Sequence, residues 1–252
     1  MAILDVRHFY DALAPWYHLV YQDWEASIAR QGQALTSLLA SEWGSLPQSV
    51  LDAAVGIGTQ ALGLAALGFQ VTGSDISPIA VHGAGEEAAR RGLRLDCFVA
   101  DVRALPVRSA TFDVILACDN ALPHLLSENE IRWAFQEFLR CLRPSGGCVI
   151  SMRDYGIPPS PGTVETKDYG DRMWSERLCR LLQICRWRRG FYDLAFELVT
   201  NDDVKEVVLR TPETTYFAIG TERMATLMGE AGFKNVRRID GCLFQPVLVG
   251  AR

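Results

Sequence analysis

Two glycines in the segment LDAAVGIGT, residues 51–59, could bring the backbone close to a ligand. Gly56 and Gly58 follow a short apolar run and precede a helical pattern. Glycines allow a sharp turn and a close approach to a bound group, and a helix N-terminus offers free N–H groups to polar ligand atoms. Because proteins that bind nicotinamide cofactors use a similar turn, the segment predicts a ligand site without defining its class.

Carboxylates end two further apolar runs. Asp75 ends the second run, in VTGSDIS (71–77), and Asp101 ends the third, in VADVRALP (99–106). A carboxylate at the end of the second strand can accept hydrogen bonds from both ribose hydroxyls, and Asp101 could accept one from an adenine amino group. Capping of the helix after Pro78 is the alternative role for Asp75. Together the two residues favour a nucleoside site.

Polar residues also follow the next two apolar runs. The run FDVILACDNALPHL (112–125) ends in a loop that contains Asn120 and His124, and Arg153 closes the apolar run 147–152. His124 is the candidate general base, although a histidine hydrogen-bonded within its loop fits equally well. A buried guanidinium needs an anionic partner and matches a carboxylate in bidentate geometry. That partner is either a substrate carboxylate or an acid of this region: Asp154, Asp168 or Asp171.

Strands and helices alternate across these motifs. We expect strands at 49–55, 70–74, 95–100, 112–118 and 147–152, with helices at 59–67, 78–91 and 127–142 between them. This alternation predicts a doubly wound, mostly parallel sheet of the Rossmann-like kind. The carboxyl ends of parallel strands share one edge, where ligands bind in open α/β sheets. The motifs are therefore expected to meet at that edge.

The flanking segments differ from this core. Residues 5–22 read as a helix broken near Pro15, residues 23–41 as a second helix, and 156–170 as a loop. Strand-like runs at 178–187, 191–200 and 204–210, separated by turn residues, predict an antiparallel meander. A helix at 221–231 and strands near 234–240 and 243–250 complete a seven-stranded sheet. We thus expect an N-terminal helical arm that serves as a lid over the cofactor or simply packs on the sheet (1–45), a cofactor domain (46–155 and 216–252) and an antiparallel insertion on the substrate side (156–215).

Composition narrows the functional classes. The formal net charge is −5 and no basic run forms a face suited to nucleic acid. The sequence contains no stretch of about 18 apolar residues, so no membrane-spanning helix is expected. Its N-terminal residues do not predict a signal peptide. The seven cysteines form no C-x-x-C pair, and the four histidines lack metal-site spacing. These features predict a cytoplasmic protein with reduced thiols, without bound metal, and with no nucleic-acid or membrane partner.

The order of the motifs resembles that of class I S-adenosylmethionine-dependent methyltransferases. Within that class the chain looks most like the glycine N-methyltransferase and glycine/sarcosine methyltransferase group. Ala54 stands in the glycine turn where that group also has alanine, and Asn120, Pro123, His124 and Leu125 resemble its N-S-F-A-H-L loop. ISMRDY (150–155) resembles its strand ending in H-R-N-Y, so Arg153 and Tyr155 fall on an arginine and a tyrosine of the family.

The resemblance implies roles for individual residues. Arg153 would bind the substrate carboxylate, Asn120 would contact the substrate, and Tyr155 and Tyr216 would add aromatic and polar walls. Asp75 would hold the ribose, Asp101 would lie near the adenine, and Arg30 would bind the carboxylate of the cofactor. Further residues expected around S-adenosylmethionine are Tyr21, Ala54, Gly56, Gly58, Ile76, Val102, Cys118 and His124.

The implied activity is methyl transfer to a small molecule, with the amino group of glycine, sarcosine or a similar amino acid as the first candidate. The methyl sulfonium is already activated, so positioning and exclusion of water are the main requirements, and a dedicated base is not obligatory. The alternatives are a small-molecule O- or N-methyltransferase of other specificity and, in a different class, a non-catalytic cofactor-binding regulator. The resemblance also leaves open a homo-oligomer.

Overall fold

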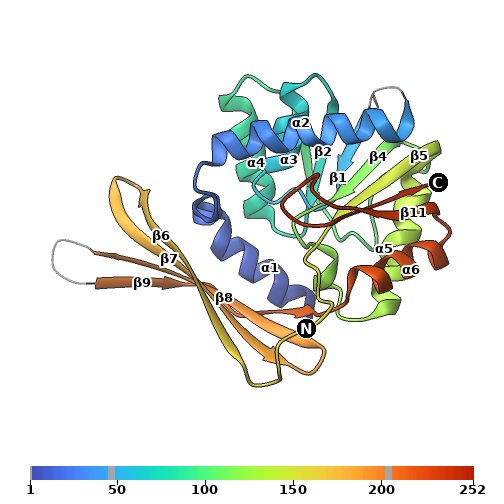
Figure 1. The fold of residues 1–252 in the computed structure, drawn as a ribbon. Coiled ribbons are helices and arrows are strands. Elements are labelled where there is room, and N and C mark those ends of the chain that lie inside the picture. The colour runs from blue at the N-terminus through green and yellow to red at the C-terminus, as the bar shows by residue number, and fades with distance from the viewer. Residues whose placement is uncertain (1, 45–48, 202–205) are drawn as a thin grey trace.

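A seven-stranded, mostly parallel sheet forms the centre of the molecule (Figure 1). The computed structural model describes residues 2–44, 49–201 and 206–252. The strand order is β11-β12-β5-β4-β1-β2-β3. β12 is antiparallel to both of its neighbours, while the other pairs are parallel. The predicted fold class is confirmed. The strands are β1 (Ser49–Asp52), β2 (Gln70–Asp75), β3 (Asp96–Val99), β4 (Phe112–Ala117), β5 (Leu142–Ser151), β11 (Lys234–Ile239) and β12 (Val247–Ala251).

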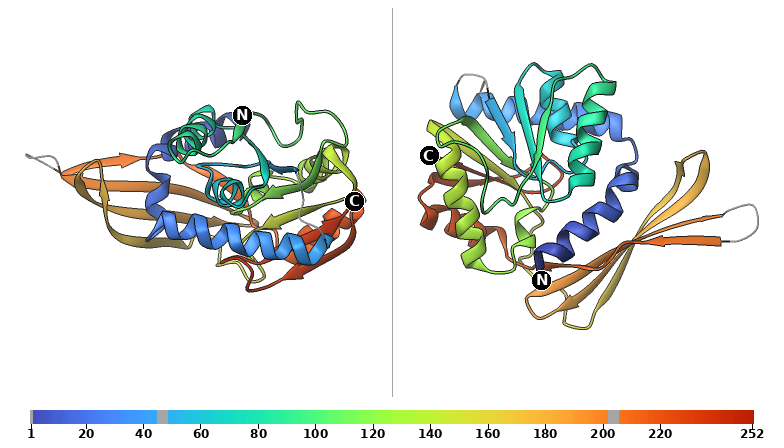
Figure 2. Two further views of the ribbon diagram at one scale, coloured as in Figure 1. Left: turned by 90° about the horizontal axis from the view of Figure 1, so that it is seen from above. Right: turned by 180° about the vertical axis from the view of Figure 1, so that it is seen from behind.

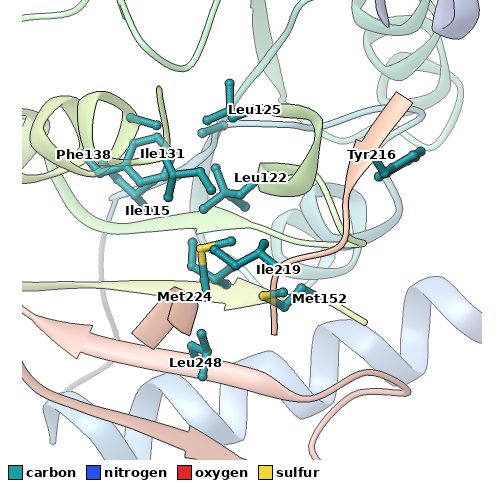
Figure 3. Close-up of a cluster of buried hydrophobic side chains, with 14 of the residues drawn as sticks. Ile115, Leu122, Leu125, Ile131, Phe138, Met152, Tyr216, Ile219, Met224 and Leu248 are labelled. Carbon is teal, nitrogen blue, oxygen red and sulfur yellow. The ribbon is translucent and has the colours of Figure 1, made fainter. Parts of the chain in front are cut away.

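Helices cover both faces of this sheet because successive strand side chains point to opposite faces. Val50 packs with Leu35 and Leu39 of α2 (Trp24–Trp43) and with α3 (Thr59–Ala66) in one apolar cluster. Its neighbour Leu51 belongs to another cluster, together with Phe138 of α5 (Glu128–Cys141) and the side chains of α6 (Thr221–Ala231). Figure 3 shows part of this second cluster. α4 (Pro78–Arg90) follows β2, as the alternating pattern predicts.

The antiparallel insertion forms a second sheet, which projects from the α/β domain (Figures 1 and 2). It contains β6 (Val164–Trp174), β7 (Arg177–Arg188), β8 (Phe191–Asn201), β9 (Glu206–Arg210) and β10 (Thr214–Phe217). The order is β10-β8-β7-β6. β9 pairs with the second half of β8, and β10 pairs with the first half. The predicted strands 178–187 and 191–200 correspond to β7 and β8. The third run, 204–210, lies partly outside the described residues.

Some predicted boundaries were wrong. The segment 156–170 was expected to be loop, but β6 begins at Val164. β6 is an edge strand whose first residues are exposed, so it lacks the apolar alternation that marks a half-buried strand. β1 ends at Asp52 rather than at 55, and β12 begins at Val247 rather than at 243, since the backbone bends before it.

The N-terminal segment packs against the second sheet. α1 (Ala2–Leu13) is followed by a 3-10 turn, η1 (Ala14–Val20), so the predicted break near Pro15 is confirmed. The Phe9 and Trp16 rings lie 6.2 Å and 6.3 Å from the ring of Phe196 on β8. In the described part of the chain, no helix combines the length and apolar character needed to span a bilayer.

Candidate active site

A cavity runs along the carboxyl ends of β1 to β4, at the edge where the sequence placed the motifs. Its walls contain most of the residues predicted to surround the cofactor: Tyr21, Ala54, Gly56, Asp75, Ile76, Asp101, Val102, Cys118 and His124. A second, adjoining cavity lies between this edge and the antiparallel sheet, and it contains Arg30, Asn120, Arg153 and Tyr216. The predicted residues are thus divided between two neighbouring cavities, whose walls share Tyr21 and Asp119.

The glycine turn and Asp75 are tied together. The Gly56 N–H donates to Asp75 Oδ2 at 2.9 Å, and the Ser77 N–H donates to Asp75 Oδ1 at 2.9 Å. Burial raises the pKa of Asp75, and these backbone donors partly offset that effect. Gly56 has a φ of 51°, and a Cβ added to it would meet no protein atom within 4 Å. The space in front of the turn is therefore open to a ligand, and Asp75 stays on its wall.

Asp101 has a partner that the sequence analysis missed. Arg103 Nη2 lies 2.6 Å from Asp101 Oδ2, and its Nε donates to Oδ1 at 3.0 Å. Burial alone would raise the pKa of Asp101, but the hydrogen bonds from Arg103 outweigh it and lower the pKa. The carboxylate is consequently fixed and charged at the wall of the first cavity.

The loop after β4 contains two consecutive residues whose backbone lies in the left-handed region. Asp119 has a φ of 55° and Asn120 a φ of 67°, a region that Asp and Asn tolerate better than other non-glycine residues. Ser151 fixes the turn, because its Oγ accepts from the Asp119 N–H and its carbonyl accepts from the Asn120 N–H, both at 2.9 Å. This turn places Asp119 on the walls of both cavities and Asn120 on the wall of the second.

Asn120 organises the wall of the second cavity. Its Oδ1 accepts from the Arg153 N–H at 3.0 Å, and its Nδ2 donates to Tyr155 Oη at 2.7 Å and to Tyr192 Oη at 3.3 Å. Tyr192 stacks on Tyr216 with ring centroids 4.9 Å apart. Tyr155 lies behind this wall rather than on it. Its neighbour Tyr192, which the sequence analysis did not select, faces the cavity instead.

The Arg153 side chain lines the second cavity without a carboxylate partner. None of the ion pairs found among the described residues includes it. Two acids proposed as its alternative partners bind elsewhere: Asp154 pairs with Arg238 and Asp168 with Arg180. A partly buried, unpaired guanidinium beside aromatic walls is complementary to an anionic group of a ligand.

His124 lies between two tyrosines. Tyr10 Oη is 2.9 Å from His124 Nε2 and 3.1 Å from Tyr216 Oη, and the Tyr216 ring lies 3.9 Å from the imidazole. Burial lowers the pKa of His124 to about 3, and the nearby backbone of Thr215 offsets little of that effect. The imidazole is therefore neutral near pH 7 and only a weak base.

Two predicted cofactor residues lie outside the first cavity. Arg30 lines the second one, where its Nη2 donates to Ser27 Oγ at 3.1 Å. Gly58 lines neither cavity and instead precedes α3 with a φ of 93°. Asp119, which faces both cavities, was not selected from the sequence. No three or more histidine, cysteine or acidic side chains gather into a metal-binding cluster within the described ranges.

Known proteins share this architecture. Residues 50–146 match a family model described as a methyltransferase domain. The chain is 32% identical over 141 residues to a glycine/sarcosine N-methyltransferase from Parasynechococcus marenigrum (strain WH8102), covering 56% of this chain and 48% of that protein. It is 28% identical over 165 residues to a glycine/sarcosine N-methyltransferase from Aphanothece halophytica, covering 64% and 60%. The chain thus spans about half the length of the curated relatives it matches.

A solved structure extends the likeness to nearly the whole chain. SAM-bound CalS10, an amino pentose methyltransferase from Micromonospora echinaspora, superposes with a TM-score of 0.76 at 16% identity, covering 94% of each chain. At this identity the superposition shows a shared fold. Residues 50–146 therefore match a methyltransferase domain, and the chain as a whole shares the fold of this S-adenosylmethionine-bound methyltransferase.

Proposed function

We propose that the protein transfers a methyl group from S-adenosylmethionine to the nitrogen of a small amine that carries a carboxylate, as glycine, sarcosine and related amino acids do. One observation carries the choice of acceptor: the unpaired Arg153 guanidinium in the cavity next to the cofactor edge. Its planar fork suits a carboxylate in bidentate geometry. The two curated glycine/sarcosine N-methyltransferases act on acceptors of this class by name.

The first cavity fits the adenosine part of the cofactor. Asp75 would accept from the ribose hydroxyls, since it stands at the end of the second strand on an open wall. The Gly56 turn and the N-terminus of α3 would receive polar atoms of the ligand. Ile76, Val102 and Asp101 would surround the adenine. The second cavity, of about 410 Å³, has room for the amino acid end of the cofactor and for the acceptor.

S-adenosylmethionine, when bound, supplies a methyl group that its sulfonium already activates. The acceptor nitrogen attacks that carbon with its lone pair, the carbon–sulfur bond breaks, and the product nitrogen releases a proton. Arg153 would fix the acceptor by its carboxylate, and Tyr192 and Tyr216 would exclude water. Because His124 is neutral and weakly basic, we expect the amine to arrive unprotonated. The rate should accordingly rise with pH as the free amine becomes available.

A substrate panel tests the proposal. Calorimetry with S-adenosylhomocysteine establishes cofactor binding, and initial rates with a labelled methyl donor follow transfer to glycine, sarcosine, dimethylglycine and larger amino acids. Ethanolamine and an amino sugar serve as matched amines without a carboxylate. Turnover of the carboxylated amines alone supports the proposal. Equal turnover of the amines without a carboxylate would show that Arg153 has another role, and absent S-adenosylhomocysteine binding would contradict methyl transfer itself.

A further inference from the structure

A second cationic side chain, Lys167, lines the cavity that contains Arg153. Lys167 lies on β6 of the antiparallel sheet, where its register partner is Gln183 on β7. Arg153, by contrast, follows β5 of the parallel sheet. The walls of the second cavity therefore present cations from two different sheets to the same space.

Neither of these cations has an anionic partner in the described part of the chain. No ion pair found there includes Arg153 or Lys167. Two acids line the same cavity but bind other groups: Asp23 caps α2, and Asp119 accepts hydrogen bonds from a tyrosine and a glutamine. A third lining cation, Arg30, is the residue expected to bind the carboxylate of the cofactor. Arg153 and Lys167 are therefore left for the acceptor.

An aromatic ring holds Lys167 at the cavity wall. Its Nζ lies 4.4 Å from the centre of the Tyr169 ring, within the distance of a cation–π interaction. Tyr169 Oη donates to Gln183 Oε1 at 2.7 Å, and both of these residues line the cavity as well. Partial burial lowers the pKa of Lys167, and the charge of Arg153 lowers it further. The two cations are thus close enough to repel each other, and an anionic ligand would relieve that repulsion.

The size of the cavity points to an acceptor larger than glycine. The cavity measures about 410 Å³. Glycine has the bulk of roughly two to three water molecules, each of which takes up about 30 Å³ in the liquid, so it would fill only part of this space. An acceptor with a longer side chain could reach from Arg153 toward Lys167.

We propose that the acceptor carries a second anionic group, which Lys167 binds while Arg153 binds the carboxylate next to the amine. The inference rests on the proposed function and narrows its substrate class to amines with two acidic groups, such as dicarboxylic amino acids. Glycine and sarcosine would then engage Arg153 and leave Lys167 without a partner. A phosphate on the side chain offers the same charge, and the test separates it from a carboxylate.

The test compares acidic acceptors with neutral analogues of similar shape. Initial rates with a labelled methyl donor are measured for glutamate against glutamine, aspartate against asparagine, and O-phosphoserine against serine. In at least one pair the wild type should use the acid ~3- to 10-fold better in kcat/KM, the range of an ion pair near the surface, with the difference in KM. Lys167→Gln should remove this preference and leave kcat/KM for the neutral analogue unchanged.

Two variants serve as controls. Arg180→Gln removes the same charge from the same sheet, but Arg180 does not line the cavity, so the preference for the acid should persist. Lys167→Arg keeps the charge and should also retain the preference. A merely structural role of Lys167 would instead lower the rates with the acid and with its neutral analogue alike.

The outcomes separate this inference from the proposed function. A wild type that uses glycine and the neutral analogues at least as well as every acid overturns the inference and leaves the proposed function intact. A preference that survives in Lys167→Gln overturns it too, because another group then binds the second anion. If S-adenosylhomocysteine binds but no carboxylated amine is methylated, the proposed function fails, and the inference fails with it. Should Lys167→Gln fail to fold, Lys167→Met, which keeps the apolar stem, takes its place.

Discussion

Replacing Asp52 with asparagine should stabilise the protein by an amount that depends on pH. Asp52 ends β1 and is 0% exposed, and neither carboxylate oxygen has a hydrogen bond of normal geometry in the described chain. Burial raises its pKa to about 7, the charges of Asp75 and Asp119 add to the effect, and the nearby N–H of Ala54 offsets part of it. Asparagine has the same shape and cannot ionise.

The direction of the pH effect follows from the pKa of Asp52 in the folded protein and in the unfolded chain. The folded protein has the higher pKa, so the unfolded chain loses its proton first, near its ordinary pKa of about 4. Below that pH the carboxyl is protonated in both states, so Asp52 costs the wild type no stability. As the pH rises to about 7, the unfolded chain ionises while the folded protein still holds the proton, and the wild type loses stability. Each pH unit is worth ~1.4 kcal/mol, so the difference in free energy of unfolding between Asp52→Asn and the wild type should grow by ~4 kcal/mol at most. Above about pH 7 it should remain constant.

Urea denaturation followed by tryptophan fluorescence, without cofactor, measures this difference between about pH 4.5 and about pH 7.5. Asp154→Asn is the control of opposite sign. The hydrogen bond from Arg238 lowers the pKa of Asp154, so its charge contributes stability at neutral pH that is lost as the pH falls. A difference between Asp52→Asn and the wild type that is the same at both pH values would show that Asp52 ionises normally and that water reaches it.

Three further outcomes are expected. Arg153→Lys should raise the KM for a carboxylated acceptor ~10-fold or more, since a point charge replaces the planar fork. S-adenosylhomocysteine affinity should stay constant, and an unchanged KM would refute the role of Arg153. Gly147→Ala should lower the free energy of unfolding by ~1–3 kcal/mol or more, because the new Cβ would overlap the Trp43 ring. Unaltered stability would mean that the tryptophan moves freely. The backbone amides of residues 9–13 should exchange slowly, because opening this segment should cost ~4 kcal/mol or more. Fast exchange there would show that the arm is detached.

The positions of the strand-end residues could be predicted from the sequence, because they follow from local pattern and one geometric rule, whereas their roles stay predictions. Asp75, Asp101 and Arg153 each close an apolar run, and parallel strands bring such ends to one edge. Asp119 was passed over because its burial depends on Tyr21 and Gln60, two side chains far away in the chain. No local pattern contains that information.

The same limit applies to partners and to edge strands. Arg103 lies only two residues from Asp101, yet its side chain could equally have pointed to solvent, and the sequence does not decide between the two directions. β6 was missed because its first residues are exposed, so backbone pairing with β7, rather than burial of a face, defines it. Tyr192 faces the second cavity only because β8 pairs with β10 in the register that stacks it on Tyr216.

The packing of the N-terminal segment, α1 and η1, bears on how an acceptor reaches the site. Phe9, Leu13 and Trp16 are buried in the core cluster that includes Phe196. Burial of one such side chain contributes ~1.5–3 kcal/mol, so releasing all three would cost at least ~4 kcal/mol, and an open arm would be populated below ~1% of the time. Lys167 and Phe244 also line the second cavity, and both are exposed. An acceptor that enters past these two side chains would meet Arg153 without displacing the arm, which is why the exchange measurement at residues 9–13 also tests the route of entry.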